Sequence, residues 1–139
     1  MPARRNRVTQ GSDYRHIVRR GNRVGGAYCI THAVFDVADT VLHPGNPGEP
    51  EGGRPARYGF IISKAVGNAV TRNLIRRRLK TIVDQRIAQG ETDIDVVFRA
   101  LPASAEASFP VLEQEVNASL DRLVRKRAAQ LKANSVRSE

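Results

Sequence analysis

The chain has 139 residues and carries 23 Lys and Arg against 14 Asp and Glu, a formal charge of +9 with a pI near 10.8. This length predicts one domain, residues 1–139, and the charge favours an anionic partner such as a nucleic acid. The absence of a bilayer-length apolar run and of an apolar segment behind the basic start argues against a membrane span and a secretory signal, so a cytoplasmic protein is expected.

Basic residues dominate the start of the chain, where residues 1–23 hold seven Arg and one Asp. Residues 1–11 are expected to be a basic N-terminal segment. Residues 12–20 are predicted to form a short helix, with Ser12 as its N-cap and Gly21 at its end. The apolar face of this helix is predicted to contain Tyr14, Ile17 and Val18.

Two strands separated by a loop are predicted next. Residues 27–37 are rich in β-branched and aromatic side chains, and their alternation gives two faces, Tyr28/Ile30/His32/Val34 and Cys29/Thr31/Ala33/Phe35. Residues 43–56 contain four Pro and four Gly and are predicted to be a flexible loop. Residues 57–64 form the following strand, with one face made of Tyr58, Phe60 and Ile62.

The rest of the chain predicts a helix, a strand and a last helix. The helix of residues 69–89 begins after Asn68 as N-cap and ends at Gly90, with a buried stripe of Ile75, Leu79, Ile82 and Val83. Residues 94–100 form a strand whose Ile94, Val96 and Phe98 face the core, with Asp95 and Arg99 on the other side. The last helix follows Ser108, with an apolar stripe of Leu112, Val116, Leu120, Leu123 and Val124. Residues 129–139 are expected to be a flexible tail, and the element order predicts an α+β sandwich.

The segment KAVGNAVTRNLIRRRLK, residues 64–80, is the most informative part of the chain. It places six cations around a Gly-Asn turn that leads into a helix: Lys64, Arg72, Arg76, Arg77, Arg78 and Lys80. A helix start already carries partial positive charge from its unpaired N–H groups, and no acidic residue follows before Asp84. A solvated basic face would explain the spacing of this row but not cations at the positive end of the dipole. The segment therefore predicts a surface that grips RNA phosphates.

Three segments of the chain resemble the protein subunit of bacterial ribonuclease P. They are RRNRVTQGSDYRHIVRRG, FIISKAVGNAVTRNLIRRRLK and the weaker DIDVVFRALPAS. The middle segment is highly specific, because the family's strand, Gly-Asn turn and Arg-rich helix are kept as a block, and the resemblance covers about residues 4–128. It implies an αβββαβα order in a ribosomal-protein-S5-like two-layer sandwich, with an unusual left-handed βαβ crossover.

The resemblance also implies a helper rather than a catalyst. In that enzyme the RNA subunit uses Mg²⁺ to cleave the 5′ leader from precursor tRNA, while the protein binds both the catalytic RNA and the leader. No catalytic residue, protein-bound cofactor or protein partner is therefore expected. The implied RNA-subunit contacts are Lys64, Asn68, Arg72, Asn73, Arg76, Arg77 and Lys80. Additional basic contacts are expected from Arg4, Arg5, Arg7 and Arg78.

The family's leader-binding cleft lies between the first helix and the sheet. The residues of this chain that are expected to line it are Tyr14, Val18, Tyr28 and His32. Val18 and His32 stand where aromatic residues are common, so base stacking would rest on Tyr14 and Tyr28; for Tyr14, core packing remains an equal alternative. The family's signature in this helix normally reads Arg-Asn-Arg, whereas this chain has Leu74 at the position of the second Arg. One phosphate contact would therefore be missing, or Arg78 would supply it.

Other interpretations of the sequence have less support. His16, His32 and His43 are scattered, and the single Cys29 excludes an internal disulfide and a multi-cysteine zinc site. Asp93 and Asp95 could help hold a hydrated Mg²⁺, but a solvated strand end is the favoured interpretation. A structural RNA-binding protein, such as a small ribosomal protein, fits composition and fold equally well, whereas the motif spacing favours ribonuclease P. Nothing in the sequence supports a nuclease that acts through its own residues.

Overall fold

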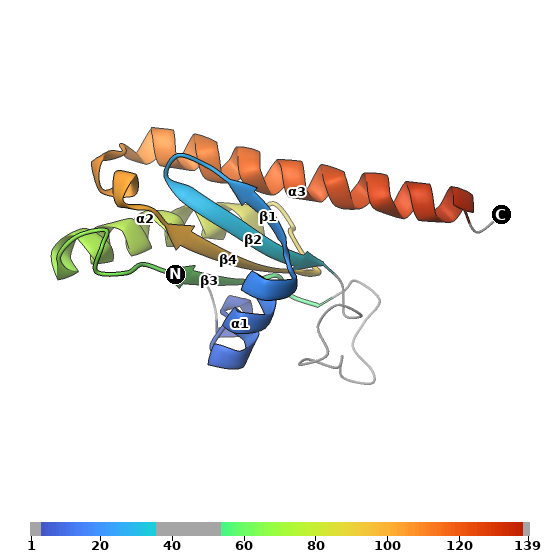
Figure 1. Cartoon of the computed structure of the whole chain (residues 1–139), viewed down its shortest axis with the longest axis horizontal. Helices are drawn as coiled ribbons and strands as arrows, with labels where there is room; N and C mark the ends of the chain where they lie inside the picture. Colours follow the sequence, from blue (N-terminus) through green and yellow to red (C-terminus); the bar gives the residue numbers. More distant parts are fainter. Residues whose placement is uncertain (1–3, 36–53, 138–139) are drawn as a thin grey trace.

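The structure is a computed structural model that describes residues 4–35 and 54–137 (Figure 1). Within these residues three strands separate the first two α-helices, as the resemblance implies. In chain order the elements, with η for a 3₁₀ turn, are η1 (Arg4–Asn6), α1 (Gly11–Arg20), β1 (Asn22–Gly25), β2 (Cys29–Phe35), β3 (Arg57–Ile61), α2 (Ala69–Ala88), β4 (Ile94–Ala100), η3 (Pro102–Glu106) and α3 (Phe109–Arg137). The α+β class and the αβββαβα order are thereby confirmed.

The strands of the described residues form one mixed sheet in the order β1-β2-β4-β3. Strand β2 pairs antiparallel with both β1 and β4, whereas β4 and β3 are parallel. Parallel neighbours need a crossover connection between them, and α2 supplies it. The residue pattern missed β1, because Asn22 and Gly25 have little intrinsic preference for a strand, and pairing with β2 makes this segment one.

Several predicted boundaries change in the structure. Strand β2 begins at Cys29 instead of residue 27, and β3 ends at Ile61 instead of residue 64. Residues 36–53, which include most of the predicted loop, lie outside the described residues. The end of that loop is packed, because Ala56 is fully buried, and α3 continues as a helix to Arg137.

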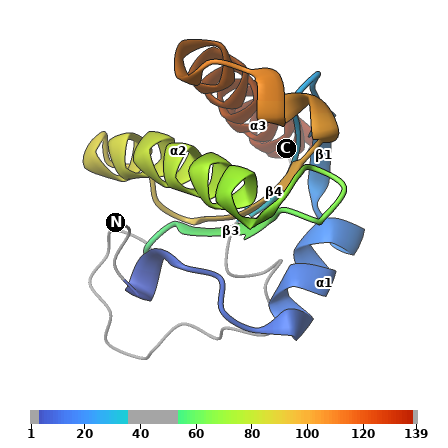
Figure 2. The ribbon, with the colours of Figure 1, turned by 90° about the vertical axis from the view of Figure 1, so that its left-hand side faces the viewer.

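The larger core lies between one face of the sheet and the helices α2 and α3, which Figure 2 shows side by side on that face. The predicted α2 stripe is confirmed, with all four side chains at most 1% exposed. The predicted α3 stripe is confirmed except at its end, where Val124 is 41% exposed. The rings of Tyr58 and Phe60 each stack on that of Phe98, and all three lie on the face of β3 and β4 that is turned to this core.

Helix α1 packs on the opposite face of the sheet, as Figure 2 also shows. Its Ile17 is buried with Val8, Val34 and Val97, and the other two predicted apolar residues pack against this smaller cluster. The prediction of Ser12 as N-cap is wrong. The N-cap is Gln10, because its carbonyl accepts hydrogen bonds from the N–H groups of residues 13 and 14 and so starts the helix earlier.

A carboxylate joins α3 to the turn between β1 and β2. Glu115 accepts hydrogen bonds from the backbone N–H groups of Ala27, Tyr28 and Cys29 at 2.6, 2.9 and 3.0 Å. A Cβ at position 26 would lie 2.5 Å from the Glu115 carboxyl carbon, so Gly26 lets the carboxylate approach the turn. Three converging N–H groups form an anion-binding concavity, and here the protein's own carboxylate occupies it.

A second carboxylate, that of Asp95, is fully buried at the start of β4. It accepts hydrogen bonds from Arg54 at 2.7 Å and from Arg57 at 2.7 and 2.9 Å, and Arg57 also contacts Asp13 of α1 at 3.4 Å. Burial acts to raise the pKa of Asp95, but the hydrogen bonds from both Arg side chains outweigh it and hold this pKa below its ordinary value. The expectation of a solvated strand end is therefore wrong.

We expect Asp95→Asn to lower the free energy of unfolding by about 3–5 kcal/mol, because it leaves the buried guanidinium group of Arg54 without its carboxylate and removes the closer of two carboxylates from the partly buried Arg57. Urea denaturation measures this loss. Asp121→Asn is the matched control: its carboxylate pairs with Arg86 but is 56% exposed, so its loss should stay near about 1 kcal/mol. Equal losses in the two variants would contradict the role given to Asp95.

The same carboxylate predicts sensitivity to acid. A group whose folded-state pKa is depressed stabilises the fold above its unfolded pKa, and this contribution is lost as the pH falls through the folded-state pKa. The free energy of unfolding of the wild-type protein should therefore decline more steeply below about pH 4 than that of Asp95→Asn. Parallel pH profiles of the two proteins would argue against this linkage.

Candidate nucleic-acid interface

The turn before α2 is built as the sequence predicts. Its N–H groups at Val66 and Gly67 bond to the carbonyls of Ser63 and Lys64, and buried Val66 attaches the turn to the larger core. The Asn68 side chain accepts a hydrogen bond from the Thr71 N–H at 2.9 Å, which confirms it as N-cap. Helix α2 therefore starts at a fixed position, and its first turn contains no acidic residue.

Most of the predicted cations begin in the turn before α2 and continue along this helix. Arg72, Arg76 and Lys80 are partly exposed along one side of α2, and Lys64, Asn73 and Arg77 are exposed beside them. Arg76 donates to the Asn73 side chain at 3.2 Å, which orients its guanidinium group along the helix surface. The Nε of Arg72 is buried and has no hydrogen-bond partner among the described residues. The row is thus a cluster of cations with few internal partners.

Arg78 lies apart from this row. Its Nη1 donates to the carbonyl of Ala107 at 2.8 Å, so it fixes the connection between η3 and α3. This non-local bond has no signal in the sequence pattern. Arg78 has a structural partner, and the structure does not bring it together with the rest of the row.

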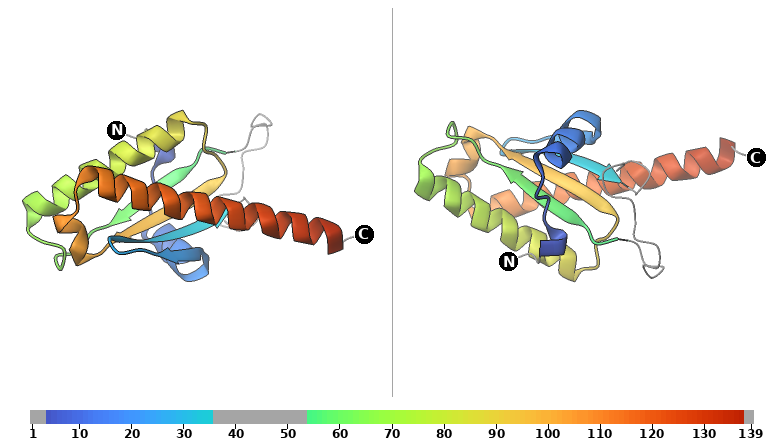
Figure 3. Two further views of the ribbon diagram at one scale, coloured as in Figure 1. Left: turned by 90° about the horizontal axis from the view of Figure 1, so that it is seen from above. Right: turned by 90° about the horizontal axis from the view of Figure 1, so that it is seen from below.

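The basic N-terminal segment lies along β3, at the edge of the sheet. Arg7 forms a bridge with Tyr58, and the Val8 N–H donates to the Tyr58 carbonyl at 3.0 Å. Figure 3 (right) shows that the segment then crosses the face of the sheet on which α1 packs and continues to α1. Arg4, Arg5 and Arg7 are all exposed, so this segment adds three cations beside β3.

Three of the four residues expected in the cleft share the face of the sheet that α1 covers. Tyr14 and Val18 of α1 are half-buried there, and His32 of β2 points to the same side as Val34. The Tyr14 ring lies over Gly59, where a Cβ would be 2.6 Å from a ring carbon. Tyr28 is different: it precedes β2 and packs against the larger core on the other face.

Two further cations flank His32 on the face of the sheet that α1 covers. Arg23 of β1 is its direct cross-strand partner, and Arg99 of β4 lies opposite the neighbouring Ile30. Burial, then Arg99 and Arg23, lower the pKa of His32. Sequence reasoning placed Arg99 on the face away from the core but gave it no role, and it missed Arg23 because it missed β1.

No cluster of three His, Cys, Asp or Glu suited to a metal ion occurs among the described residues. Asp93, the other half of the alternative Mg²⁺ site, accepts a hydrogen bond from the Arg54 N–H at 2.9 Å, and Asp95 is held by its two Arg partners. Burial raises the pKa of Cys29 to about 12, so its thiol is neutral. No helix in the described part of the chain is long and apolar enough to cross a membrane.

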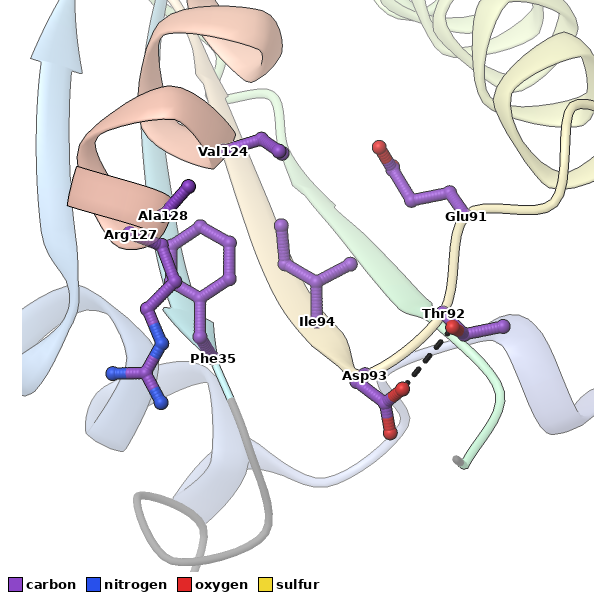
Figure 4. A pocket seen from close by; sticks show the side chains of 8 residues that line it. All are labelled: Phe35, Glu91, Thr92, Asp93, Ile94, Val124, Arg127 and Ala128. Carbon is purple, nitrogen blue, oxygen red and sulfur yellow. Dashed lines mark hydrogen bonds between the residues drawn. The ribbon is translucent and has the colours of Figure 1, made fainter. Parts of the chain in front are cut away.

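A hollow of about 510 Å³ opens between the sheet and the second half of α3 (Figure 4). Its apolar lining comes from β2, β4 and α3, and its polar rim includes Arg127 and Asp93. The lining residues are Phe35, Glu91, Thr92, Asp93, Ile94, Val124, Arg127 and Ala128. None of the predicted binding residues borders it, so this hollow is separate from both basic surfaces.

Comparison with known proteins identifies relatives of the whole chain. The family model described as Ribonuclease P matches residues 1–124. The ribonuclease P protein component of Clavibacter michiganensis is 41% identical over 125 residues, covering 90% of this chain and 98% of the relative. That of an Arthrobacter species is 36% identical over 145 residues, covering 100% of this chain and 96% of the relative.

Solved structures show the same fold. The ribonuclease P protein of Thermotoga maritima aligns with a TM-score of 0.63 at 18% identity, over 87% of this chain and 97% of that one. The Staphylococcus aureus protein aligns with a TM-score of 0.62 at 17% identity, over 88% and 94% of the two chains. Both matches support the sheet order and helix placement described above.

We expect Asn68→Ala to destabilise the protein by about 1 kcal/mol, because it removes the N-cap of α2. Asn68→Asp should keep the cap, and so the stability, while placing a negative charge beside the cation row. Urea denaturation and RNA binding, measured on both variants, separate the two effects. RNA binding that weakens only in Asn68→Ala would show that the row acts through helix stability and not through its charge.

Proposed function

Because the chain belongs to the ribonuclease P protein family, we propose that it binds the catalytic RNA of ribonuclease P and the 5′ leader of precursor tRNA. The holoenzyme of this family is an endoribonuclease, and this chain is its protein subunit. In our proposal the RNA subunit carries out the cleavage with Mg²⁺, and the protein positions the two RNA partners.

The start of α2 is the proposed contact with the catalytic RNA. Arg72, Arg76 and Arg77 add positive charge to the partial positive charge of this helix start. The first turn contains no acidic residue that would neutralise it. Backbone N–H groups and guanidinium groups directed to one place favour phosphate. This unneutralised charge at a helix start is the observation that carries the proposal, since fold stability alone would select the opposite charge.

The face between α1 and the sheet is the proposed site of the leader. Tyr14 of α1 is partly exposed there, and Arg23 and Arg99 supply charge from β1 and β4. Aromatic stacking tolerates any base and contributes about 1–3 kcal/mol per base. A site that combines stacking with phosphate contacts can therefore accept leaders of different sequence.

The excess of positive charge gives the subunit a second effect. A protein of charge +9 neutralises phosphates that would otherwise recruit cations from solution. We propose that this neutralisation lowers the Mg²⁺ concentration at which the catalytic RNA folds and cleaves.

Precursor-tRNA cleavage at low, near-physiological Mg²⁺ tests the proposal, with the source organism's catalytic RNA in the presence and absence of this protein. We expect strong stimulation by the protein and no cutting by the protein alone. Tight RNA binding without stimulation would favour a structural RNA-binding protein instead. Cutting by the protein alone would overturn both assignments.

Salt dependence tests the role of the cation row. We expect Arg72→Ala with Arg76→Ala to weaken binding to the catalytic RNA and to reduce the log–log salt slope by roughly 0.7–0.9 for each phosphate that the variant no longer neutralises. Arg122→Ala with Arg125→Ala is the matched control, because it removes the same charge from exposed positions on α3. Equal slopes in the two double variants would show that Arg72 and Arg76 do not contact the catalytic RNA.

A further inference from the structure

A group of three basic side chains occupies the open face of the sheet beside α1. The group, here the Arg–His–Arg cluster, consists of Arg23, His32 and Arg99. Arg23 is the cross-strand partner of His32, and Arg99 lies two residues beyond Val97, the β4 partner of His32. Direct partners in antiparallel strands have Cβ atoms about 4.5–5.5 Å apart, and diagonal neighbours about 7–8 Å. The three side chains therefore meet on one surface.

The middle member of the cluster is buried without partners. His32 is 4% exposed, and neither of its ring nitrogens has a hydrogen-bond partner in the structure of the described residues. Buried polar atoms are nearly always paired, because an unpaired one costs about 1–3 kcal/mol. Arg23 and Arg99 are both exposed, so their guanidinium groups can reach a ligand that arrives from solvent over the ring.

The charges that surround the ring are nearly all positive. Strand β1 contributes Arg23, and β4 contributes Arg99 on one side and Asp95 on the other, where two Arg side chains already bind that carboxylate. From α1, the residues that pack on this face are Tyr14, Ile17 and Val18, which carry no charge, while Asp13 contacts Arg57. No ion pair joins Arg23 or Arg99 to another residue of the described chain. Among the described residues, the cluster therefore has no anion.

We propose that Arg23 and Arg99 bind a phosphate of the single-stranded leader, and that His32 takes up a proton when this phosphate is bound. The inference rests on the proposed function of the cleft and adds to it a defined phosphate site and a dependence on pH. Two guanidinium groups supply planar donors for phosphate oxygens. A bound phosphate would also cancel the field that these groups exert on the ring.

The direction of the pH dependence follows from the charges. In the unbound protein, burial and the two Arg side chains hold the pKa of His32 below its ordinary value of 6.5. The phosphate removes the repulsion, so the pKa of His32 rises on binding. Linkage then requires leader affinity to increase as the pH falls through the window between the bound-state and unbound-state values, and to be independent of His32 above it.

NMR titration of the His32 ring in the full-length protein tests the first step, with and without oligouridylate as the probe. We expect its pKa to rise when the RNA binds. In the unbound protein, Arg23→Gln and Arg99→Gln should each raise this pKa, because each removes a nearby cation, and the dispersed amide spectrum reports whether the variants fold. A pKa of His32 that does not change with RNA, or that stays unchanged in the two variants, would overturn the proton-uptake step.

Binding affinity tests the second step. Between about pH 8 and about pH 5.5, oligouridylate affinity should increase about threefold to tenfold more in the wild-type protein than in His32→Gln, since one unit of pKa shift corresponds to tenfold in affinity. His16→Gln is the control, because it removes a histidine of α1 that does not belong to the cluster. If His32→Gln and the wild-type protein show the same pH dependence, the proton-uptake step is wrong.

The two proposals fail in different ways. Stimulation of precursor-tRNA cleavage at low Mg²⁺ depends on the subunit role and not on proton uptake by His32. Stimulation together with a pH-independent contribution of His32 would leave the subunit role in place and remove the further inference. Oligouridylate binding could be weaker in both Arg23→Gln and Arg99→Gln while RNA leaves the pKa of His32 unchanged. That result would support the phosphate site and contradict proton uptake by His32.

Discussion

The ion pairs of the buried Asp95 carboxylate are the interaction on which the placement of α1 over the sheet depends. This carboxylate binds Arg54 and Arg57 at the entrance to β3, and Arg57 also contacts Asp13 in the first turn of α1. A carboxylate without solvent has to be paired, and a paired one cannot shift without leaving a buried charge. The strands β3 and β4 and the helix α1 are therefore held together at one place, which sets where α1 lies over the sheet.

Both proposed RNA surfaces follow the same physical logic. At the start of α2, cations stand where the helix already presents partial positive charge, and on the cleft face His32 lies between Arg23 and Arg99. Two carboxylates, by contrast, have partners within the chain: Asp95 binds two Arg side chains, and Glu115 accepts hydrogen bonds from three backbone N–H groups. Charge that is left without an internal partner, next to so much that is paired, indicates partners that come from outside the chain.

The positions of the candidate residues in the fold were predicted correctly where they depended on one continuous segment. The row of Arg72 and Arg76 and the cap at Asn68 lie on a single helix, whose 3.6-residue repeat fixes which side chains are neighbours. Prediction failed where side-chain direction depends on distant contacts. Tyr28 leaves the alternation of β2 and packs into the larger core, and Arg78 reaches the Ala107 carbonyl 29 residues away.

The sequence by itself determined the helices, the longer strands, their apolar faces and the segregation of basic charge, because these follow from local periodicity and composition. Only the tertiary structure decided that Asn22–Gly25 is a strand, that Asp95 is buried, and that Arg23 and Arg99 meet at His32. These features depend on pairing between strands, within the β1–β2 hairpin for Asn22–Gly25 and between segments far apart in the chain for Asp95 and Arg99. The free energy that selects such a pairing comes from burying the surfaces of both segments together, so the sequence of either segment alone does not predict it.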